Sequence, residues 1–248
     1  MLSEPLDISI INAKVREYWR VNMVELTTST QSDLVRLVRS ANAHAGDVIL
    51  AEYQSSGRGR LSRSFEALAG TALLFSFYIT PARSRQDWGW IPLIAGASVA
   101  QVLSHLNAQV KWPNDILIKD KKISGIIAEA IDEGIVIGIG INVGMKESEL
   151  PVPNATSMLI EGAIDKDRNR ILSEFLNSFY VNFMNWDRGS DEIRAIYQGL
   201  SATIGRPVRI EYPNGRFEVG TAVAISNAGE LVLDTGTYVQ AGDITHLR

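Results

Sequence analysis

Three apolar runs follow one another closely in the middle of the chain, at residues 110–112 with 116–118, at 123–131 and at 135–143. Only two short polar turns separate them, Asp120-Lys121-Lys122 and Asp132-Glu133-Gly134. Connections this short join antiparallel strands, because a parallel pair needs a long crossover between its strands. The middle of the chain therefore predicts successive antiparallel hairpins, and the rest of the sequence has to fold around that sheet.

Apolar segments on both sides of the hairpins supply further elements. Short runs at 48–52 and 71–79 are rich in strand-forming residues. Helical spacing of apolar residues predicts helices, which fall at 30–46, 88–106, 168–186 and 193–200. The predicted fold class is α/β (α+β), with a mixed, largely antiparallel sheet and helices on one side of it.

The composition changes near Ser201, where the helical spacing ends. Short apolar runs then alternate with glycine-containing turns, at 208–212, 217–226, 230–233 and 238–239. Short, evenly spaced strands of this kind are typical of a small β-barrel. We therefore expect a larger domain over residues 1–200 and a small C-terminal β-barrel domain over 201–248.

The composition argues against several classes of function. The 248 residues carry a net charge of −4, which does not favour a nucleic-acid partner held by general electrostatics. No segment approaches the roughly 18 consecutive apolar residues of a membrane span, so we expect no membrane partner. Cysteine is absent and the histidines are far apart, which argues against a structural zinc. The N-terminus shows no secretory signal pattern, so we expect a cytoplasmic location.

Two basic segments carry most of the chemical information. Residues 57–60 read Gly-Arg-Gly-Arg, and such a loop can hold a phosphate through backbone N–H groups and guanidinium donors. Residues 111–115 read Lys-Trp-Pro-Asn-Asp, and Lys122 follows one strand and turn later. Together they predict the chemistry of a polyphosphate with a small acid. Taken singly, the glycine-arginine segment is also compatible with a mobile basic loop, and residues 111–115 with an ordinary turn. Lys122 is also compatible with a hairpin lysine that keeps the sheet soluble.

Five motifs occur in an order that resembles the biotin protein ligases, also called biotin–acetyl-CoA-carboxylase ligases. They lie at Ser29-Thr30-Gln31, 52–63, 111–115, Lys122-Ile123-Ser124-Gly125 and Gly140-Ile141-Asn142. The short C-terminal strands agree with the small C-terminal domain of that family. Two positions depart from the family pattern, because Ser62 stands where many relatives have glycine and Phe65 where many have tryptophan.

The resemblance implies a two-step reaction, catalysed by the domain over residues 1–200. Biotin and ATP, with Mg²⁺, form biotinyl-5′-AMP and pyrophosphate, and biotin then passes to a lysine of a biotin carboxyl carrier domain in a carboxylase. The implied catalytic residues are Lys122, Arg58, Arg60, Asp115 and Lys111. The implied biotin-binding residues are Ser29, Thr30, Gln31, Gln54, Gly57, Arg58, Gly59, Arg60, Lys122 and Gly125. The implied ATP- or adenylate-binding residues are Arg60, Arg63, Phe65, Lys111, Asn114 and Asn142.

Lys122 is the first candidate for neutralising the repulsion between the biotin carboxylate and the α-phosphate. For Asp115 three roles stay open: binding Mg²⁺, orienting a lysine, or assisting the acceptor amine.

Few residues precede Ser29, fewer than a winged helix-turn-helix needs. The resemblance is therefore to the form that lacks the N-terminal DNA-binding domain, a monofunctional ligase with no DNA partner. A homodimer is possible. Two other functions remain open. Lipoate ligases and octanoyltransferases are similar in fold, but their apolar substrates do not require Gln54 and the Ser29-Thr30 pair. A non-catalytic biotin or nucleotide sensor is the second alternative.

Overall fold

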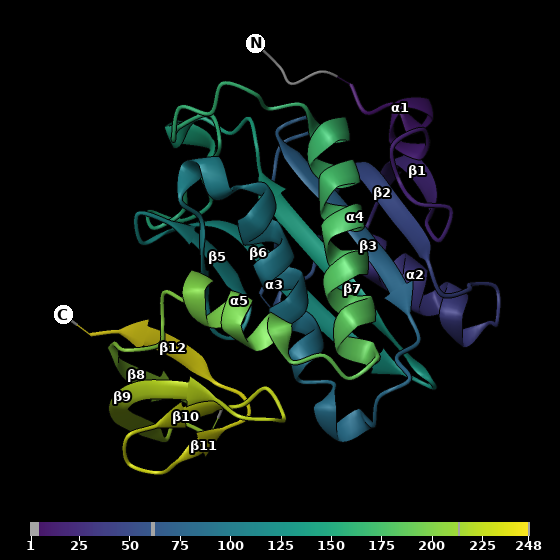
Figure 1. Ribbon diagram of the computed structural model, residues 1–248. Helices are drawn as coiled ribbons and strands as arrows, with labels where there is room; N and C mark the ends of the chain where they lie inside the picture. The colour runs from purple at the N-terminus through teal and green to yellow at the C-terminus, as the bar shows by residue number, and fades with distance from the viewer. Residues whose placement is uncertain (1–4, 61–62, 213, 248) are drawn as a thin grey trace.

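The computed structural model describes residues 5–60, 63–212 and 214–247, so Ser62 lies outside the described residues. Within them, a seven-stranded sheet has the order β1-β2-β3-β7-β6-β5-β4 (Figure 1). Its strands are β1 (Arg20–Thr27), β2 (Asp47–Gln54), β3 (Ala72–Ile79), β4 (Gln109–Lys111), β5 (Asp115–Ile118), β6 (Lys121–Ile131) and β7 (Gly134–Asn142). β1 and β2 are parallel and the other neighbouring pairs are antiparallel, which confirms the mixed, largely antiparallel sheet.

The predicted hairpins form, with one difference in the first run. β5 pairs with β6, and β6 pairs with β7, in antiparallel register. The first apolar run is two strands rather than one, because Trp112-Pro113-Asn114 turns the chain between β4 and β5. Lys111 and Asp115 are thereby opposite each other at the base of the turn. The hairpin thus brings two predicted site residues together.

Two elements near the N-terminus were not predicted. They are α1 (Ile8–Asn12) and β1. β1 is an edge strand in which most side chains are exposed or half-buried, so its sequence contains no apolar run that would reveal it.

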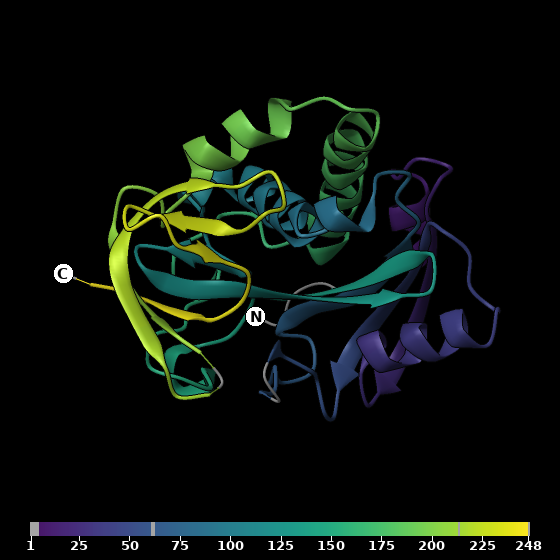
Figure 2. The ribbon, with the colours of Figure 1, turned by 90° about the horizontal axis from the view of Figure 1, so that it is seen from below.

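Helices cover both faces of the sheet, which corrects the expectation of helices on one side. The helices are α2 (Thr30–Arg39), α3 (Trp90–Val102), α4 (Arg168–Asp187) and α5 (Glu192–Leu200). Figure 2 shows α3, α4 and α5 above the sheet and α2 below it. Every residue of β3 and β7 is buried, and a strand buried on both faces needs cover on both. No helix in the described part of the chain is long and apolar enough to cross a membrane.

The larger hydrophobic core lies between the sheet and helices α3 and α4. Aromatic side chains of β3 and α4 meet there, and the ring centroids of Phe77 and Phe179 are 4.7 Å apart. A smaller core on the opposite face joins α2 to the sheet through Leu34, Ile49 and Val136. Both cores hold the strands rigidly, so residues at their ends have fixed positions.

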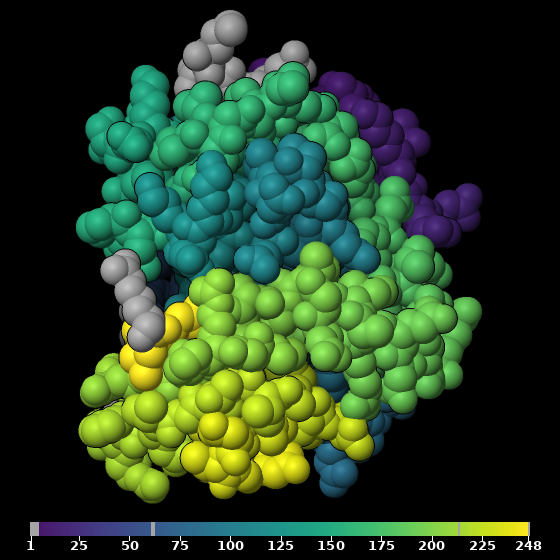
Figure 3. All heavy atoms as spheres, turned by 60° about the vertical axis from the view of Figure 1, so that its left-hand side comes forward, coloured from purple at the N-terminus to yellow at the C-terminus, as the bar shows by residue number. Residues whose placement is uncertain are grey.

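The C-terminal strands form an open, curled sheet instead of the closed barrel that the sequence suggested. They are β8 (Pro207–Glu211), β9 (Phe217–Ile225), β10 (Leu231–Leu233), β11 (Tyr238–Val239) and β12 (Asp243–His246), in the order β11-β10-β9-β8-β12. Within the described residues β11 and β12 are the two edges, while β9 bends strongly (Figure 2). β12 was not predicted. Figure 3 shows these residues packed against the segment that contains α5.

Candidate active site

A cavity of about 300 Å³ lies where β2, the β4–β5 turn, β6 and β7 meet the start of α2 and the loop after β2. β12 of the C-terminal sheet closes another side of it. The predicted site residues that line it are Ser29, Thr30, Gln31, Gln54, Arg58, Gly59, Arg60, Arg63, Phe65, Lys111, Asn114, Asp115, Lys122 and Gly125. Gly57 lines a wider adjoining cleft of about 920 Å³. Segments far apart in the sequence therefore share one cavity.

The entrance of α2 supplies hydroxyl groups at one end of the cavity. Ser29 caps the helix, and its side chain accepts from the N–H of Ser32. The backbone N–H and the hydroxyl of Thr30 both donate to Oε1 of Gln54, at 2.7 and 3.0 Å. The Thr30 hydroxyl also lies 2.8 Å from Oγ of Ser76. This network fixes the Gln54 amide, so its Nε2 donor has a defined direction.

Gln31 presents an acceptor without a partner. Its Nε2 donates to the carbonyl of Val136 at 3.1 Å, which fixes the amide plane. Oε1 is buried and, among the described residues, receives no hydrogen bond. A buried acceptor left unpaired costs about 1–3 kcal/mol. The site therefore has a built-in place for an N–H donor from a ligand.

Two glycines of β7 make room for this arrangement. A Cβ at Gly138 would stand 2.7 Å from Oε1 of Gln31, and a Cβ at Gly140 would stand 2.5 Å from the ring of Phe65. The sequence showed these glycines, but their spacing matched no phosphate- or dinucleotide-binding motif. Their role is to let side chains from other elements approach the strand closely.

The opposite end of the cavity is cationic. Nζ of Lys122 lies 2.5 Å from Oδ1 of Asp115. A Cβ at Gly125 would lie 3.1 Å from that Nζ, so glycine leaves the space that the lysine uses. Burial lowers the pKa of Lys111 and the neighbouring charge of Lys122 lowers it further, while Asp115 opposes the shift. Two lysines lie near one carboxylate, which is paired with Lys122, and this leaves positive charge available for an anion.

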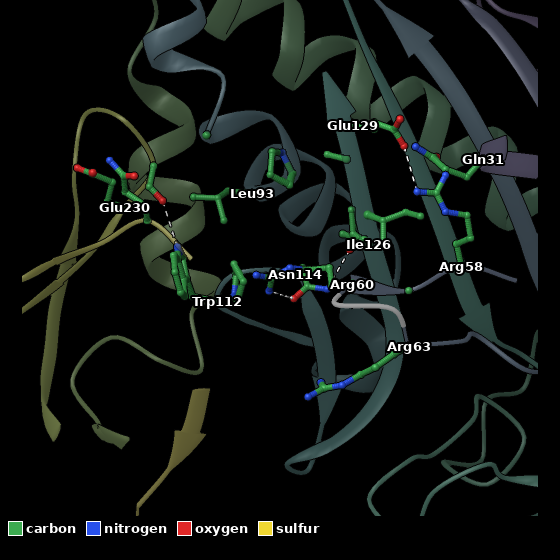
Figure 4. A pocket seen from close by; sticks show the side chains of 18 of the residues that line it. Gln31, Arg58, Arg60, Arg63, Leu93, Trp112, Asn114, Ile126, Glu129 and Glu230 are labelled. Carbon is green, nitrogen blue, oxygen red and sulfur yellow. Dashed lines mark hydrogen bonds and ion pairs between the residues drawn. The ribbon is translucent and has the colours of Figure 1, made fainter. Parts of the chain in front are cut away.

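The loop after β2 carries three arginines, and each has a partner on a different segment. Nη1 of Arg60 donates to Oδ1 of Asn114 at 2.9 Å, beside the cavity (Figure 4). Arg58 turns towards Glu129 instead, with 3.2 Å between Nη2 and Oε2 (Figure 4). Arg63 forms an ion pair with Asp243 of β12. The loop is thus tied to three different elements around the cavity.

The structure does not bring Asn142 to the cavity with the other predicted residues. It is absent from the lining of both the cavity and the cleft. Its Nδ2 donates to the carbonyl of Thr156 at 2.9 Å, and the side chain is buried. Its adenylate-binding role therefore stays a prediction.

Sequence reasoning missed several residues of the cavity lining, and Ser76 and Asp243 are two of them. Ser76 is the one serine in a strand of otherwise apolar and aromatic residues, and that contrast was an available signal. Asp243 lies in a strand that the sequence did not reveal, and only the fold places it opposite the loop.

Acidic side chains at the site are few. No group of three or more potential metal ligands occurs in the residues that the structure describes. The carboxylate of Asp115 is held by Lys122. A Mg²⁺ ion at this site would depend mainly on phosphate oxygens of the nucleotide, because one engaged carboxylate does not make a protein-only site.

Comparisons with known proteins define the class first. Residues 23–146 match the model of the Biotin/lipoate A/B protein ligase family, and residues 203–247 match the Biotin protein ligase C terminal domain. These two matches place the chain in the class of biotin and lipoate protein ligases.

Similar proteins distinguish between the biotin and the lipoate ligases of this class. The chain is 37% identical to the biotin--[acetyl-CoA-carboxylase] ligase of Mycobacterium tuberculosis, over 93% of this chain and 90% of that protein. It is 30% identical to the bifunctional ligase/repressor BirA of Bacillus subtilis, over 87% of this chain and 70% of that one. A biotin protein ligase from Aquifex aeolicus, solved with biotin and ATP, superposes with a TM-score of 0.79 at 26% identity, covering 92% of this chain and 99% of that one. The chain belongs to the biotin protein ligase family.

Proposed function

We propose that the protein is a biotin–[acetyl-CoA-carboxylase] ligase. It activates biotin with ATP to biotinyl-5′-AMP, releases pyrophosphate, and transfers biotin to a lysine of a biotin carboxyl carrier domain. The observation that carries this proposal is a single cavity with amide and hydroxyl groups at one end and two lysines around one carboxylate at the other. The first end suits a polar ring, and the second suits two anions that must react.

The ureido ring of biotin fits the polar end. It carries two N–H donors and one carbonyl acceptor, and burying them unpaired is costly. Oε1 of Gln31 is a ready acceptor for one N–H, and the amide of Gln54 is a fixed donor for the carbonyl. Ser29 and Thr30 add hydroxyl groups beside it. An octanoyl or lipoyl chain has no ureido donor for Gln31, so this end favours biotin.

The cationic end serves the first chemical step. A carboxylate oxygen of biotin attacks the α-phosphorus of ATP, the bond to the bridging oxygen breaks, and pyrophosphate leaves. Lys122 and Lys111 neutralise the repulsion between the two anions before the reaction, which is electrostatic preorganisation. Asp115 holds Lys122 in place, and the structure favours this orienting role among the three considered for it.

The loop after β2 covers the reactive intermediate. Arg60 reaches across to Asn114, and Arg63 reaches β12, so the loop spans the cavity. A closed loop excludes water from the mixed anhydride. In the second step the amine of the acceptor lysine attacks the acyl carbonyl, AMP leaves, and the amine gives up a proton. Arg58 reaches a phosphate only by leaving Glu129, so its phosphate contact requires a change of rotamer.

A Mg²⁺ ion that entered with the nucleotide would supply charge neutralisation during adenylation, and Asp115 is the carboxylate among the predicted site residues that would contact it. We also propose that residues 1–200 form the catalytic domain and 201–248 a second domain. The proposed acceptor is a biotin carboxyl carrier domain, and the proposed location is the cytoplasm. A homodimer and the absence of a DNA partner are part of the same hypothesis.

One assay tests the proposal. Biotin-dependent exchange of labelled pyrophosphate into ATP is measured with the full chain, with lipoate and octanoate as comparators. We expect exchange with biotin alone. Exchange with lipoate or octanoate but not biotin would identify a different acyl ligase, and tight biotin binding without any exchange would identify a sensor.

A further inference from the structure

The turn between β4 and β5 is held from outside the large sheet. The backbone N–H of Trp112 donates to Oγ1 of Thr203 at 3.1 Å, in a fully buried position. The indole Nε1 of Trp112 donates to the carbonyl of Gly229 at 3.1 Å. Both acceptors belong to the segment that builds the C-terminal sheet. The turn that carries the site lysine and carboxylate is therefore fixed from that sheet.

The Thr203 hydroxyl has a second partner, His246 of β12. Oγ1 lies 3.1 Å from Nε2 of the imidazole. On the other side of the ring, Nδ1 lies 3.5 Å from Nη1 of Arg206, which also donates to Asp120 at 2.9 Å. A guanidinium group can only donate, so Nδ1 is an acceptor and the neutral ring carries its hydrogen on Nε2. The Thr203 oxygen then accepts from both the histidine and the turn.

The surroundings of His246 keep the ring in this neutral form. Burial lowers its pKa to about 4, and the nearby charges of Lys111 and Arg206 act in the same direction. An imidazolium ring would point a second N–H at Arg206, which has no acceptor to offer. The hydrogen-bond direction from His246 through Thr203 to the turn is thus defined near neutral pH.

We propose that Thr203 and His246 are positioning residues for adenylation, acting from the C-terminal sheet through the β4–β5 turn. The inference rests on the proposed function. Neither residue bonds Lys111 or Asp115 directly, but the turn sets the distance between those two side chains. When catalytic groups are displaced by about 1 Å, the rate of the reaction can fall by roughly a hundredfold. The C-terminal sheet therefore contributes to the chemical step as well as to stability.

The test compares matched variants in the pyrophosphate exchange assay. Thr203→Val keeps the shape and removes the acceptor, and we expect kcat to fall by about 10- to 100-fold. KM for biotin stays within threefold or so of the wild type, because Gln31 and Gln54 lie at the other end of the cavity. Thr203→Ser restores the hydroxyl, and with it most of kcat.

A second pair keeps the inference testable if Thr203→Val fails to fold. His246→Gln retains an N–H near the position of Nε2, whereas His246→Phe retains only the ring. We expect the kcat of His246→Gln to exceed that of His246→Phe by at least about fivefold, because only His246→Gln retains a hydrogen-bond donor.

Trp90→Phe serves as the control at the same interface. It removes the hydrogen bond from Trp90 Nε1 to the carbonyl of Ser226, which is 3.0 Å long, and it keeps the groups that bond Trp112 to Thr203 and Gly229. It should lower the melting temperature and leave kcat unchanged. Equal kcat losses in Thr203→Val and Trp90→Phe, or no rescue by serine, would overturn the positioning role.

Hydrogen exchange separates this inference from the proposed function. The Trp112 amide should lose protection in Thr203→Val and keep it in Trp90→Phe, whatever reaction the protein catalyses. Absence of biotin-dependent exchange in the wild type would refute the proposed function alone. An unchanged Trp112 amide in Thr203→Val would refute the positioning role alone.

Discussion

Replacing Lys122 by alanine removes the cation that stands closest to the shared carboxylate of the site. Nζ of Lys122 lies 2.5 Å from Asp115, and the glycine at position 125 leaves the space that it occupies. After the substitution Lys111 alone would face that carboxylate. An incoming phosphate would then meet a site with one fewer positive charge.

The expected decrease in kcat of Lys122→Ala follows from the charges at the site and their exposure to solvent. Two unit charges about 4 Å apart interact by about 4 kcal/mol at an effective dielectric near 20. The side chain of Lys122 is 33% exposed, so solvent weakens this interaction. Taking about 2–3 kcal/mol as the loss in the transition state gives a decrease in kcat of roughly 30- to 150-fold. KM for biotin should change little, because the ureido partners lie elsewhere.

The measurement is biotin-dependent pyrophosphate exchange, at saturating ATP and varied biotin. Lys121→Ala is the matched control, because Lys121 is exposed and lines a different hollow of the surface. Lys122→Arg retains the charge and should keep more activity than Lys122→Ala. The reasoning fails if Lys122→Ala keeps more than about a tenth of wild-type kcat, since 1.4 kcal/mol is one factor of ten. It also fails if Lys121→Ala loses as much.

Three further predictions concern binding and stability. Gly138→Ala puts a Cβ 2.7 Å from Oε1 of Gln31, so KM for biotin should rise about tenfold. The overpacking should also lower the free energy of unfolding by about 1–3 kcal/mol. An unchanged KM would contradict this prediction. Arg168→Met leaves Glu52 without its buried cation, 2.8 Å away, and urea unfolding should show a loss of about 3 kcal/mol; a loss below about 1 kcal/mol, as for an exposed pair, would count against it. The pKa of His246 is lowered to about 4, so only the unfolded chain gains its proton between pH 6.5 and 4. The stabilising effect is complete above pH 6.5 and is lost as the pH falls, by about 1–2 kcal/mol after allowing for solvent screening; His246→Gln should flatten this part of the urea-midpoint profile.

Local signals explain which elements were predictable. The hairpins from residue 115 to residue 142 carry their own turns and apolar pattern, so neighbouring residues encode them. β1 and β12 are edge strands, and their sequences contain no comparable pattern. The expectation of helices on one side was wrong. The apolar runs of β3 and β7 show that these strands are buried, but they do not indicate which elements cover each face of the sheet. Barrel closure failed for a related reason, since it depends on which strands become neighbours.

The features of the site also divide into those that the sequence predicted and those that only the tertiary structure decided. The order of the motifs in the sequence indicated the family and nominated side chains from Ser29 to Asn142, because the residue types that this chemistry needs can be recognised in the sequence. Only the tertiary structure decided that Arg58 pairs with Glu129, that Asn142 lies apart from the cavity, and that β12 closes one side of it. These outcomes depend on contacts between segments up to 180 residues apart, as in the Arg63–Asp243 pair. Local propensity contains no information about such contacts, because packing of the whole chain selects them.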